Sequence, residues 1–374
     1  MRIAFAILRL SPAGGLEQHA LRLAAILAAR GHGVTFVTTR APTTEAPAGV
    51  DVQLLPDRGR TNHGRLSAFA EDASRAAREF DRNVAFHAIP GFDVVFCADP
   101  SRSRPSAPKS WLPRYRAYAR LERQAFGPDG RSLVLCLSSA QRDAFIRNDR
   151  TPPERLVLLP PTVDRVAADP RAPTPETRVA ARARLGLGEA SPVWLWMGLQ
   201  PKTKGLDRAF AALAAAPAAR LMVTGLDPTS RPGAAARRAA QRLGVDARVT
   251  WLGFCTQQQL SDAKAAADLL LHPSRADVTG TVILEAMASG LPVITTAVCG
   301  YGEHVTLADA GVVLPEPFHA PDLAAALARA TPDQLAAWSA NALAYARRDE
   351  LYTGLERAAD AIESAALAPP VRSA

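Results

Sequence analysis

The sequence has few cysteines, few lysines and no long apolar run. Its four cysteines among 374 residues show no CxxC spacing, which argues against a disulfide scaffold and favours reduced, structural cysteines in a cytoplasmic protein. No stretch approaches the roughly 18 consecutive apolar residues of a membrane-spanning helix. The apolar stretch at residues 3–8 is followed by Arg9 and a glycine turn, so we expect a buried strand there rather than a signal peptide.

The composition is that of a soluble globular protein, but its charge is uneven. Hydrophobic residues make up 48% and charged residues 21%, and 374 residues suit two domains of roughly 150–200 residues. Residues 1–165 hold 24 Lys/Arg against 16 Asp/Glu, whereas residues 166–374 hold 20 of each, so the net charge of +8 belongs to the first half. Such a field favours an anionic partner, either nucleic acid, a phosphorylated glycan or a membrane surface. A generally arginine-rich composition explains part of this excess.

Short apolar runs alternate with helical patterns along most of the chain. This alternation predicts an α/β fold, in which two doubly wound Rossmann-like domains with parallel sheets face each other across a cleft. A proline-rich stretch at residues 160–175 predicts the linker. We therefore expect one domain at residues 1–165, a second at 166–348, and a final helix within 349–374. The expected strands are residues 3–8, 34–38, 52–55, 94–97, 133–137, 156–159, 193–197, 221–224, 249–252, 269–271 and 293–296.

Two glycines, Gly14 and Gly15, separate the first expected strand from the first helix. Glycine lets the backbone approach a ligand, and the following helix N-terminus offers free N–H groups to an anion. The segment is not GxGxxG and no acidic residue follows at the dinucleotide spacing, so a Rossmann dehydrogenase is disfavoured. A tight connection without a ligand is an equally good explanation of the pair.

Two of the chain's four lysines, Lys202 and Lys204, lie in one loop, at residues 198–206. An expected strand ends there and a helix begins. Lysine supplies a compact positive charge suited to a diphosphate. The alternative is a solvated surface loop, but arginine is the usual cation of this chain, so the clustered lysines favour a binding role.

A third segment, residues 273–292, joins a buried strand to a helix whose first turn contains Gly280 and Thr281. Backbone N–H groups at such a helix start can hold phosphate oxygens. Glu285 lies about one turn further on and can accept hydrogen bonds from ribose hydroxyls, while Asp277 lies in the preceding loop and can reach a sugar ring. Because the neighbours of Glu285 are apolar, this carboxylate needs a partner.

Together these three segments resemble glycosyltransferase family 4, a retaining family with the two-domain GT-B fold. The family signature is two acidic residues separated by seven, then Gly-x-Pro; here it reads Asp277-x7-Glu285 and Gly290-Leu291-Pro292. Aspartate at 277 stands where the family usually has glutamate. The resemblance implies a UDP-sugar donor in residues 166–348 and an acceptor in residues 1–165, with the C-terminal helix packed back on that first domain.

A narrower resemblance is to the lipopolysaccharide core glucosyltransferase I subfamily. It implies that Lys204 neutralises the diphosphate, that Gly15 packs under the phosphate, and that Asp99 lies near the reacting centre. An arginine usually precedes the lysine, and Lys202 is the candidate to replace its charge. His19 stands where the subfamily tends to have aspartate, which affects acceptor contacts. The residues that carry this resemblance are Thr61-Asn62-His63-Gly64-Arg65, Pro90-Gly91-Phe92-Asp93-Val94, Ala98-Asp99, Tyr115-Arg116-x-Tyr118, Glu122-Arg123, 266–273 and 295–301.

Residues 100–131 contain eight basic residues against Glu122 and Asp129, interleaved with aromatic rings. This pattern favours an anionic inner-membrane surface, where each charge contributes about 1 kcal/mol. The same composition suits a phosphorylated lipopolysaccharide core acceptor or a plain exposed helix, whereas nucleic acid is disfavoured because no recognised binding module is present. The acceptor-binding or membrane-facing candidates are His19, Asn62, His63, Lys109, Trp111, Arg114, Arg116 and Arg120.

No Asp-x-Asp motif or metal-ligand cluster accompanies these segments, so we expect transfer without a metal or other cofactor. The catalytic candidates are Lys204, Asp277 and Asp99, the last as an acceptor contact or base. Three hypotheses remain: a glucosyltransferase that acts at the inner face of the membrane, from UDP-glucose onto a core heptose; a family 4 transferase for another donor sugar, or for a capsule or lipid-linked acceptor; and a non-transferring relative, either an epimerase or a sugar-nucleotide-binding protein.

Overall fold

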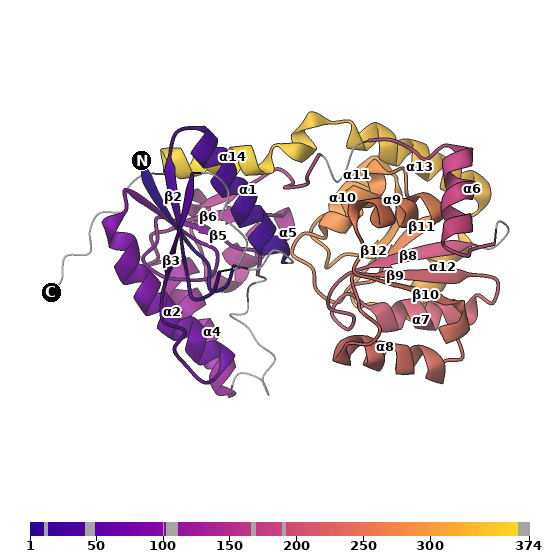
Figure 1. Ribbon diagram of the computed structural model, residues 1–374, viewed down its shortest axis with the longest axis horizontal. Coiled ribbons are helices and arrows are strands. Elements are labelled where there is room, and N and C mark those ends of the chain that lie inside the picture. The colour runs from indigo at the N-terminus through magenta and orange to yellow at the C-terminus, as the bar shows by residue number, and fades with distance from the viewer. Residues whose placement is uncertain are drawn as a thin grey trace. The chain divides into compact units, whose positions relative to one another are not determined.

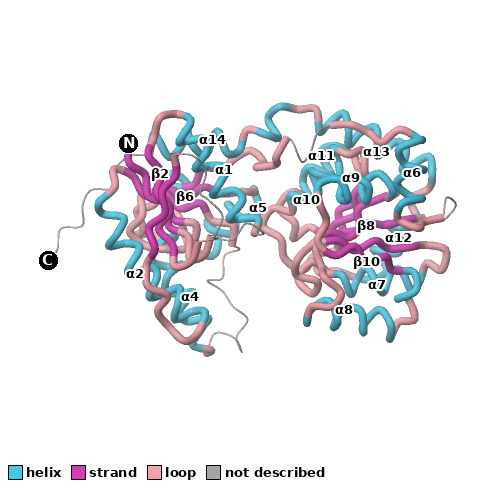
Figure 2. Tube along the Cα trace, viewed as in Figure 1, coloured by secondary structure: helices cyan, strands magenta, loops and turns pink. Residues whose placement is uncertain are grey.

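The computed structural model describes residues 1–10, 14–41, 49–99, 101, 111–165, 170–188 and 192–365. These residues form two compact units (Figure 1). The first unit comprises Met1–Thr162 together with the chain from Tyr352 onward, and the second comprises Val163–Leu351. Each unit is a parallel sheet with helices on both faces (Figure 2), which confirms the predicted pair of Rossmann-like units.

The first unit contains seven parallel strands in the order β3-β2-β1-β4-β5-β6-β7. Alternate residues of β1 pack on opposite faces of the sheet. Ala4 and Ala6 face α2, where they join Phe69 in one apolar cluster, and Phe5 packs its ring edge-on against Phe36 and Phe86. The strands are β1 Arg2–Ala6, β2 Gly33–Thr38, β3 Val50–Leu54, β4 Arg82–Ala85, β5 Val94–Phe96, β6 Leu133–Cys136 and β7 Leu156–Leu158; the helices are α1 Gly15–Ala29, α2 Asn62–Ala76, α4 Pro113–Phe126 and α5 Ser139–Ala144.

The second unit contains six parallel strands in the order β10-β9-β8-β11-β12-β13. Trp196 and Phe210 belong to the apolar cluster between this sheet and the helices α7, α8 and α12. The strands are β8 Val193–Met197, β9 Arg220–Thr224, β10 Val249–Gly253, β11 Leu269–His272, β12 Val293–Thr296 and β13 Gly311–Leu314. The helices are α6 Pro175–Arg184, α7 Leu206–Ala215, α8 Arg231–Arg242, α9 Gln257–Ala266, α10 Thr281–Ala288, α11 Gly302–Ala308, α12 Ala320–Ala328 and α13 Pro332–Ala346.

Two strands, β4 and β13, are absent from the sequence prediction. β4 begins with polar residues, yet it lies inside the sheet between β1 and β5. Asn83 and Asp93 accept each other's backbone N–H through their side chains, at 3.0 and 2.8 Å, and this exchange compensates for the polar sequence. β13 begins at Gly311, and a glycine at the start of a short apolar run is typical of a turn as much as of a strand.

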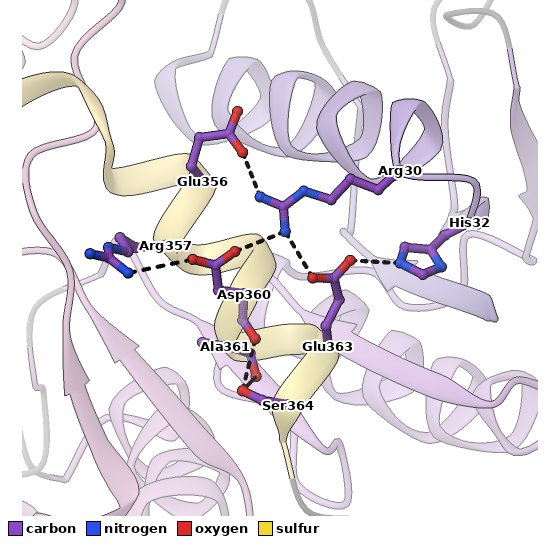
Figure 3. Close-up of polar contacts among 8 residues, drawn as sticks. All are labelled: Arg30, His32, Glu356, Arg357, Asp360, Ala361, Glu363 and Ser364. Atoms are coloured by element: carbon purple, nitrogen blue, oxygen red, sulfur yellow. Dashed lines mark hydrogen bonds and ion pairs between the residues drawn. The ribbon is translucent and has the colours of Figure 1, made fainter.

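The last helix, α14 Gly354–Ser364, packs on α1 within the first unit (Figure 3). The guanidinium of Arg30 binds three carboxylates of α14, at 2.6 Å from Glu356, 2.9 Å from Asp360 and 2.8 Å from Glu363. The ring of His32 lies 2.7 Å from the same Glu363. A single arginine thus joins the C-terminal helix to the first helix of the chain.

Candidate functional site

The loops after β8 and β11 carry three candidate donor-binding residues, Lys202, Lys204 and Asp277, and backbone contacts join the two loops. β8 and β11 are neighbouring parallel strands, so both loops leave the same edge of the sheet. The N–H of Arg275 donates to the carbonyl of Thr203 at 2.7 Å. Gly205, the N-cap of α7, has a φ of 71°, and a Cβ there would lie 1.9 Å from the carbonyl oxygen of Pro273. Glycine is therefore required where the two loops meet.

Lys204 and Asp277 are brought into direct contact at this edge. The Nζ of Lys204 lies 2.7 Å from Oδ2 of Asp277. Trp196, near the end of β8, donates its indole N–H to the carbonyl of Lys204 at 3.0 Å, which fixes the loop beneath the lysine. The side chain of Lys204 is 23% exposed and that of Asp277 is 10% exposed, so the lysine is the outer partner.

His272, the last residue of β11, lies buried against Asp277. Its Nε2 is 3.0 Å from Oδ2 of Asp277 and 3.0 Å from Oγ of Ser274. Its carbonyl accepts a hydrogen bond from the hydroxyl of Thr295 on β12, at 3.0 Å. This bond holds the backbone of His272 against the neighbouring strand, and the imidazole faces the same carboxylate oxygen as Lys204.

The backbone around Asp277 is held by the segment that follows β12. Asp277 and Cys299 form an isolated parallel bridge. The N–H of Gly300 donates to the carbonyl of Asp277 at 3.1 Å, and the N–H of Tyr301 donates to the carbonyl of Thr279 at 2.7 Å. These bonds give the loop before α10 a single defined path, so the carboxylate of Asp277 is positioned from both ends.

The cluster formed by Lys204, Asp277, His272 and Cys299 is strongly charged. Burial disfavours ionisation of Asp277, but the hydrogen bond from His272 and the charge of Lys204 outweigh it and hold the pKa of Asp277 below its usual value. Burial also disfavours a charged imidazole, yet the contacts with Asp277 and Cys299 raise the pKa of His272 to about 9. Burial raises the pKa of the Cys299 thiol, and the contact with His272 more than offsets it. At neutral pH two cations therefore share one carboxylate.

The side chains of His272, Asp277 and Cys299 form a set that could hold a metal ion. One nitrogen of His272, one carboxylate oxygen of Asp277 and the sulfur of Cys299 lie within 4.8 Å of one another. Nitrogen, oxygen and sulfur ligands of this kind suit zinc. However, Lys204 already presents a positive charge to Asp277, so one of the chain's own residues supplies a cation to this carboxylate.

Helix α10 carries the remaining donor candidates of the second unit. Gly280 is its N-cap, with a φ of 81°, and Thr281 is its first residue. Glu285 lies one turn further on and is partly buried. Burial raises the pKa of Glu285, while the charge of Lys264 on α9 and a hydrogen bond with Thr281 act against that rise. Lys264 is thus the charged partner that a carboxylate among apolar neighbours requires.

Lys202 is placed differently from Lys204. Its side chain is exposed, and its carbonyl accepts a hydrogen bond from the guanidinium of Arg275 at 2.8 Å. The same guanidinium binds Asp207 through two contacts of 2.7 Å. The structure therefore gives Lys202 a solvent-facing charge beside the Lys204–Asp277 pair, in a loop stiffened by Arg275.

Gly14 and Gly15 belong to the first unit, where Gly14 is the N-cap of α1 and Gly15 its first residue. A Cβ on Gly15 would meet no atom within 4 Å, whereas one on Gly14 would collide with the carboxylate of Glu17. The fold itself leaves room for a side chain at Gly15. Residues 11–13, which precede the pair, lie outside the described residues.

Asp99 lines a hollow of about 350 Å³ in the first unit. The amide of the buried Gln141 donates to the carbonyls of Cys97 at 2.8 Å and Asp99 at 3.0 Å, which fixes the loop after β5. The hollow brings carboxylates, guanidinium groups and an amide together with aromatic and aliphatic side chains, a lining suited to a polar, hydroxyl-rich ligand. Its lining residues are Leu8, Arg9, Glu17, Asn62, Arg65, Leu66, His87, Asp99 and Tyr118.

The two histidine candidates of the first unit do not line this hollow. The Nε2 of His19 lies 3.1 Å from the hydroxyl of Thr162, at the end of the first unit, and burial lowers the pKa of His19 to about 4. The Nε2 of His63 lies 3.3 Å from the hydroxyl of Thr61, which caps α2. His19 is therefore a neutral histidine that joins α1 to the end of the first unit.

Helix α4 carries the described part of the basic segment and lies beside α2 (Figure 1). Trp111, just before the helix, is 85% exposed. Arg114 packs over the ring of Tyr115 at 4.8 Å, and Arg116 and Arg120 are exposed. Lys109 lies outside the described residues. Every helix among the described residues is too short or too polar to span a bilayer.

Sequence analysis did not assign a site role to Trp196, Lys264, His272 or Cys299. Two signals were available. His272 is the one polar residue of β11 and stands at its carboxyl end, the sheet edge where ligands bind in open α/β folds. Lys264 is one of only four lysines in the chain. Trp196 and Cys299 carry no such signal, because a buried tryptophan or cysteine has the pattern of ordinary core.

Comparison with known proteins places both units. Residues 13–166 match the family model for Glycosyltransferase Family 4, and residues 178–348 match the model for glycosyl transferases group 1. The lipopolysaccharide glucosyltransferase WaaG of Escherichia coli K12 is 36% identical over 379 residues, covering 97% of this chain and 98% of that protein. A crystal structure of WaaG matches with a TM-score of 0.87 and 32% identity over 97% of this chain and 100% of that chain.

Two further similarities are more distant. The D-inositol 3-phosphate glycosyltransferase of Xylanimonas cellulosilytica is 31% identical over 331 residues, 77% of this chain and 76% of that protein. The structure of Anabaena Alr3699/HepE in complex with UDP-glucose matches with a TM-score of 0.73 over 97% of this chain and 100% of that chain. At 21% identity, the likeness to HepE shows the shared fold alone.

Proposed function

Because the chain belongs to glycosyltransferase family 4, with the GT-B fold, we propose that it transfers glucose from UDP-glucose onto a heptose of the lipopolysaccharide core, with retention. Membership confirms the predicted family, fold class and enzyme class. The observation that carries the choice of reaction is the 36% identity to a lipopolysaccharide glucosyltransferase along 97% of the chain. The contact between Lys204 and Asp277 supports it, since the two residues expected to hold diphosphate and sugar stand together.

In the proposed donor complex, Lys204 and the N-terminus of α10 face the diphosphate. Asp277 accepts from a sugar hydroxyl, and Glu285 accepts from the ribose hydroxyls. Their arrangement supports this assignment, because Lys204, Asp277 and α10 occupy the carboxyl edge of one parallel sheet. Glu285 lies within the same helix as Gly280 and Thr281, one turn from the expected phosphate position.

The proposed reaction is a front-face substitution, as the family resemblance implies. The bond between the sugar carbon and the diphosphate oxygen breaks, the acceptor oxygen bonds to that carbon from the same face, and the acceptor proton passes to the departing diphosphate. Lys204 stabilises the negative charge that develops on the leaving group. The hollow that contains Asp99 and Asn62 is the proposed acceptor site, with Asp99 in contact with the acceptor hydroxyl.

Metal independence is part of the proposal. A lysine in contact with the donor site can neutralise the developing charge that a divalent cation neutralises in other transferases. Transfer should therefore persist in excess EDTA. Loss of transfer that zinc or magnesium restores would instead assign a metal, and the set of His272, Asp277 and Cys299 is where zinc would be sought.

We further propose that the exposed face around Trp111 and helix α4 binds the anionic inner face of the cytoplasmic membrane. Trp111 is 85% exposed, and Arg114, Arg116 and Arg120 are exposed near it along the chain. Exposed rings and basic side chains suit the headgroup region. The full chain should sediment with vesicles that contain phosphatidylglycerol and not with pure phosphatidylcholine, and a variant with all three arginines changed to serine should lose this difference.

The deciding experiment is transfer from labelled UDP-glucose to purified core oligosaccharide that ends in heptose. We expect a product heavier by one hexose and stoichiometric release of UDP. Parallel reactions with UDP-galactose and UDP-N-acetylglucosamine test the donor sugar, because single hydroxyls can decide preference. Since an inositol phosphate glycosyltransferase is 31% identical, inositol 3-phosphate is the second acceptor to test. Transfer to inositol phosphate without transfer to core would overturn the proposal.

A further inference from the structure

Lys204 and His272 both face the same oxygen of Asp277. The Nζ of Lys204 lies 2.7 Å from Oδ2, and the Nε2 of His272 lies 3.0 Å from it. The side chains are 23%, 10% and 1% exposed for Lys204, Asp277 and His272 respectively. The three groups therefore run from the surface inward, with the carboxylate between the ammonium group of Lys204 and the imidazole of His272.

This order has an energetic consequence for any anion that approaches Lys204. In the free protein the lysine is already paired with Asp277, so a diphosphate must compete with an internal carboxylate. A carboxylate left without a cation at this depth is strongly disfavoured. Lys204 can turn toward a diphosphate at low cost only if Asp277 keeps a second partner, and the imidazole of His272, 3.0 Å away, is in place to be that partner.

We propose that His272 is a positioning residue that acts as the permanent hydrogen-bond partner of Asp277, so that Lys204 alternates between Asp277 and the donor diphosphate. This inference rests on the proposed donor site. Asp277 then has two effects of opposite sign: it holds the sugar of the donor, and it weakens binding of the diphosphate. Donor binding begins by separating an ion pair that the fold has already made.

The inference predicts an unusual order of affinities for UDP, which contains the diphosphate but no sugar. Asp277→Asn removes the competing charge while it keeps the size of the side chain, so UDP should bind more tightly, by about tenfold. His272→Gln removes the imidazole from Asp277, so Lys204 is less free to leave the carboxylate and UDP should bind more weakly, by about tenfold. In the double variant the carboxylate is gone, so UDP affinity should return to that of Asp277→Asn.

The binding is measured by calorimetry on the full chain, with UMP as the matched ligand. UMP lacks the second phosphate, so its affinity should change little in these variants. Asp262→Asn is the matched variant, because it removes the same charge from a similarly buried acidic residue that pairs with Arg184 and not with Lys204. It should leave UDP affinity unchanged. Thermal unfolding reports whether each variant is folded.

The outcomes separate this inference from the proposed function. If the wild-type chain binds neither UDP nor UMP, the donor assignment fails, and the inference fails with it. If the wild-type chain binds UDP but Asp277→Asn binds it equally or more weakly, only the inference is overturned. If His272→Gln binds UDP weakly and the double variant binds it just as weakly, His272 acts through packing and not through Asp277. If His272→Gln fails to fold, the comparison of Asp277→Asn with Asp262→Asn still decides the question.

Discussion

Trp196 donates its indole N–H to the carbonyl oxygen of Lys204 at 3.0 Å. The tryptophan is fully buried in the sheet of the second unit, whereas the lysine side chain reaches the surface. A core residue therefore fixes the position of the loop that carries Lys204, the expected phosphate-binding residue.

Trp196→Phe tests this link, because it keeps an aromatic ring in the core and removes the donor. The lost hydrogen bond and the lost ring volume should lower the free energy of unfolding by about 2 kcal/mol. The Kd for UDP should rise severalfold, since the loop of Lys204 loses its support. Denaturant unfolding and calorimetry give the two quantities. Trp194→Phe, in the same strand, is the control: its UDP affinity should not change, and an equal loss in both variants would rule out a specific role for the indole.

Gly15→Ala tests whether the start of α1 meets the donor phosphate. A Cβ at this position has no neighbour within 4 Å, so the fold should accept alanine without loss of stability. If the phosphate packs against Gly15, the methyl group should weaken UDP binding by about tenfold or more. Gly33→Ala, at the opposite edge of the same sheet and equally open, should leave UDP binding unchanged. Unchanged UDP binding in Gly15→Ala would place the phosphate elsewhere.

Glu285→Gln tests the proposed contact with ribose. Burial makes the carboxylate costly, so the amide should leave the stability of the protein unchanged or slightly raise it. Loss of a charged acceptor should weaken UDP binding by about tenfold, because such hydrogen bonds contribute about 1.5–3 kcal/mol. Binding of pyrophosphate, which has no ribose, should not change. Glu303→Gln, at an exposed site on α11, is the control. An equal loss for both ligands would mean that Glu285 supports the phosphate site instead.

His272 and His19 predict opposite pH dependences of stability. The pKa of His272 is raised from 6.5 to about 9, so its contribution is complete below about pH 6.5 and is lost as pH rises through 9. The pKa of His19 is lowered to about 4, so its contribution is complete above about pH 6.5 and is lost as pH falls toward 4.

Urea unfolding of wild type, His272→Gln and His19→Gln across pH 4–9.5 measures these contributions. Relative to His272→Gln, the wild type should lose up to about 3 kcal/mol between pH 6.5 and 9. Relative to His19→Gln, it should lose stability between pH 6.5 and 4. Parallel curves for wild type and His272→Gln above pH 6.5 would contradict a charged His272.

Arg30→Ala tests the attachment of the C-terminal helix. Exposed ion pairs contribute about 0–1 kcal/mol each, so the loss of three partners of one guanidinium should cost about 1–2 kcal/mol. The cost should fall in 0.5 M salt, which screens partly exposed charges. Arg165→Ala, which removes the exposed pair with Asp349, should lower the free energy of unfolding by less than Arg30→Ala does. A cost for Arg30→Ala that salt does not reduce would indicate packing rather than charge.

Sequence reasoning predicted most strands because a buried parallel strand is a continuous apolar run. It missed β4, where burial depends on an exchange of side-chain bonds between Asn83 and Asp93 that no local pattern reveals. The residues of the donor site could be found because Lys204, Asp277 and Glu285 lie in loops and helix starts with recognisable chemistry. Their pairing could not, because the contact of Lys204 with Asp277 joins positions 73 residues apart through the adjacency of β8 and β11.

The departure from the family pattern at position 277 acquires a physical meaning from the structure. Aspartate is one methylene shorter than glutamate, and here its carboxylate is held between Lys204 and His272. The shorter side chain thus fits a position in which the carboxylate lies close to the protein's own cations. Whether a glutamate would reach past them toward a sugar is testable by Asp277→Glu, for which the ratio of UDP-glucose affinity to UDP affinity should change.

The chain leaves the first unit after Thr162 and returns to it at Tyr352, so the second unit is an insertion within the first. During synthesis, α1 therefore cannot pack against α14 until the entire inserted unit has left the ribosome. At about 5–20 residues per second, the 189 residues between Thr162 and Tyr352 correspond to roughly 10–40 s. Over that interval Arg30 and the apolar face of α1 lack their final partners, and the second unit has time to fold first. Because the second unit is one continuous segment, residues 163–351, it can be exchanged between relatives as a single piece. The first unit must be assembled from two segments of the chain.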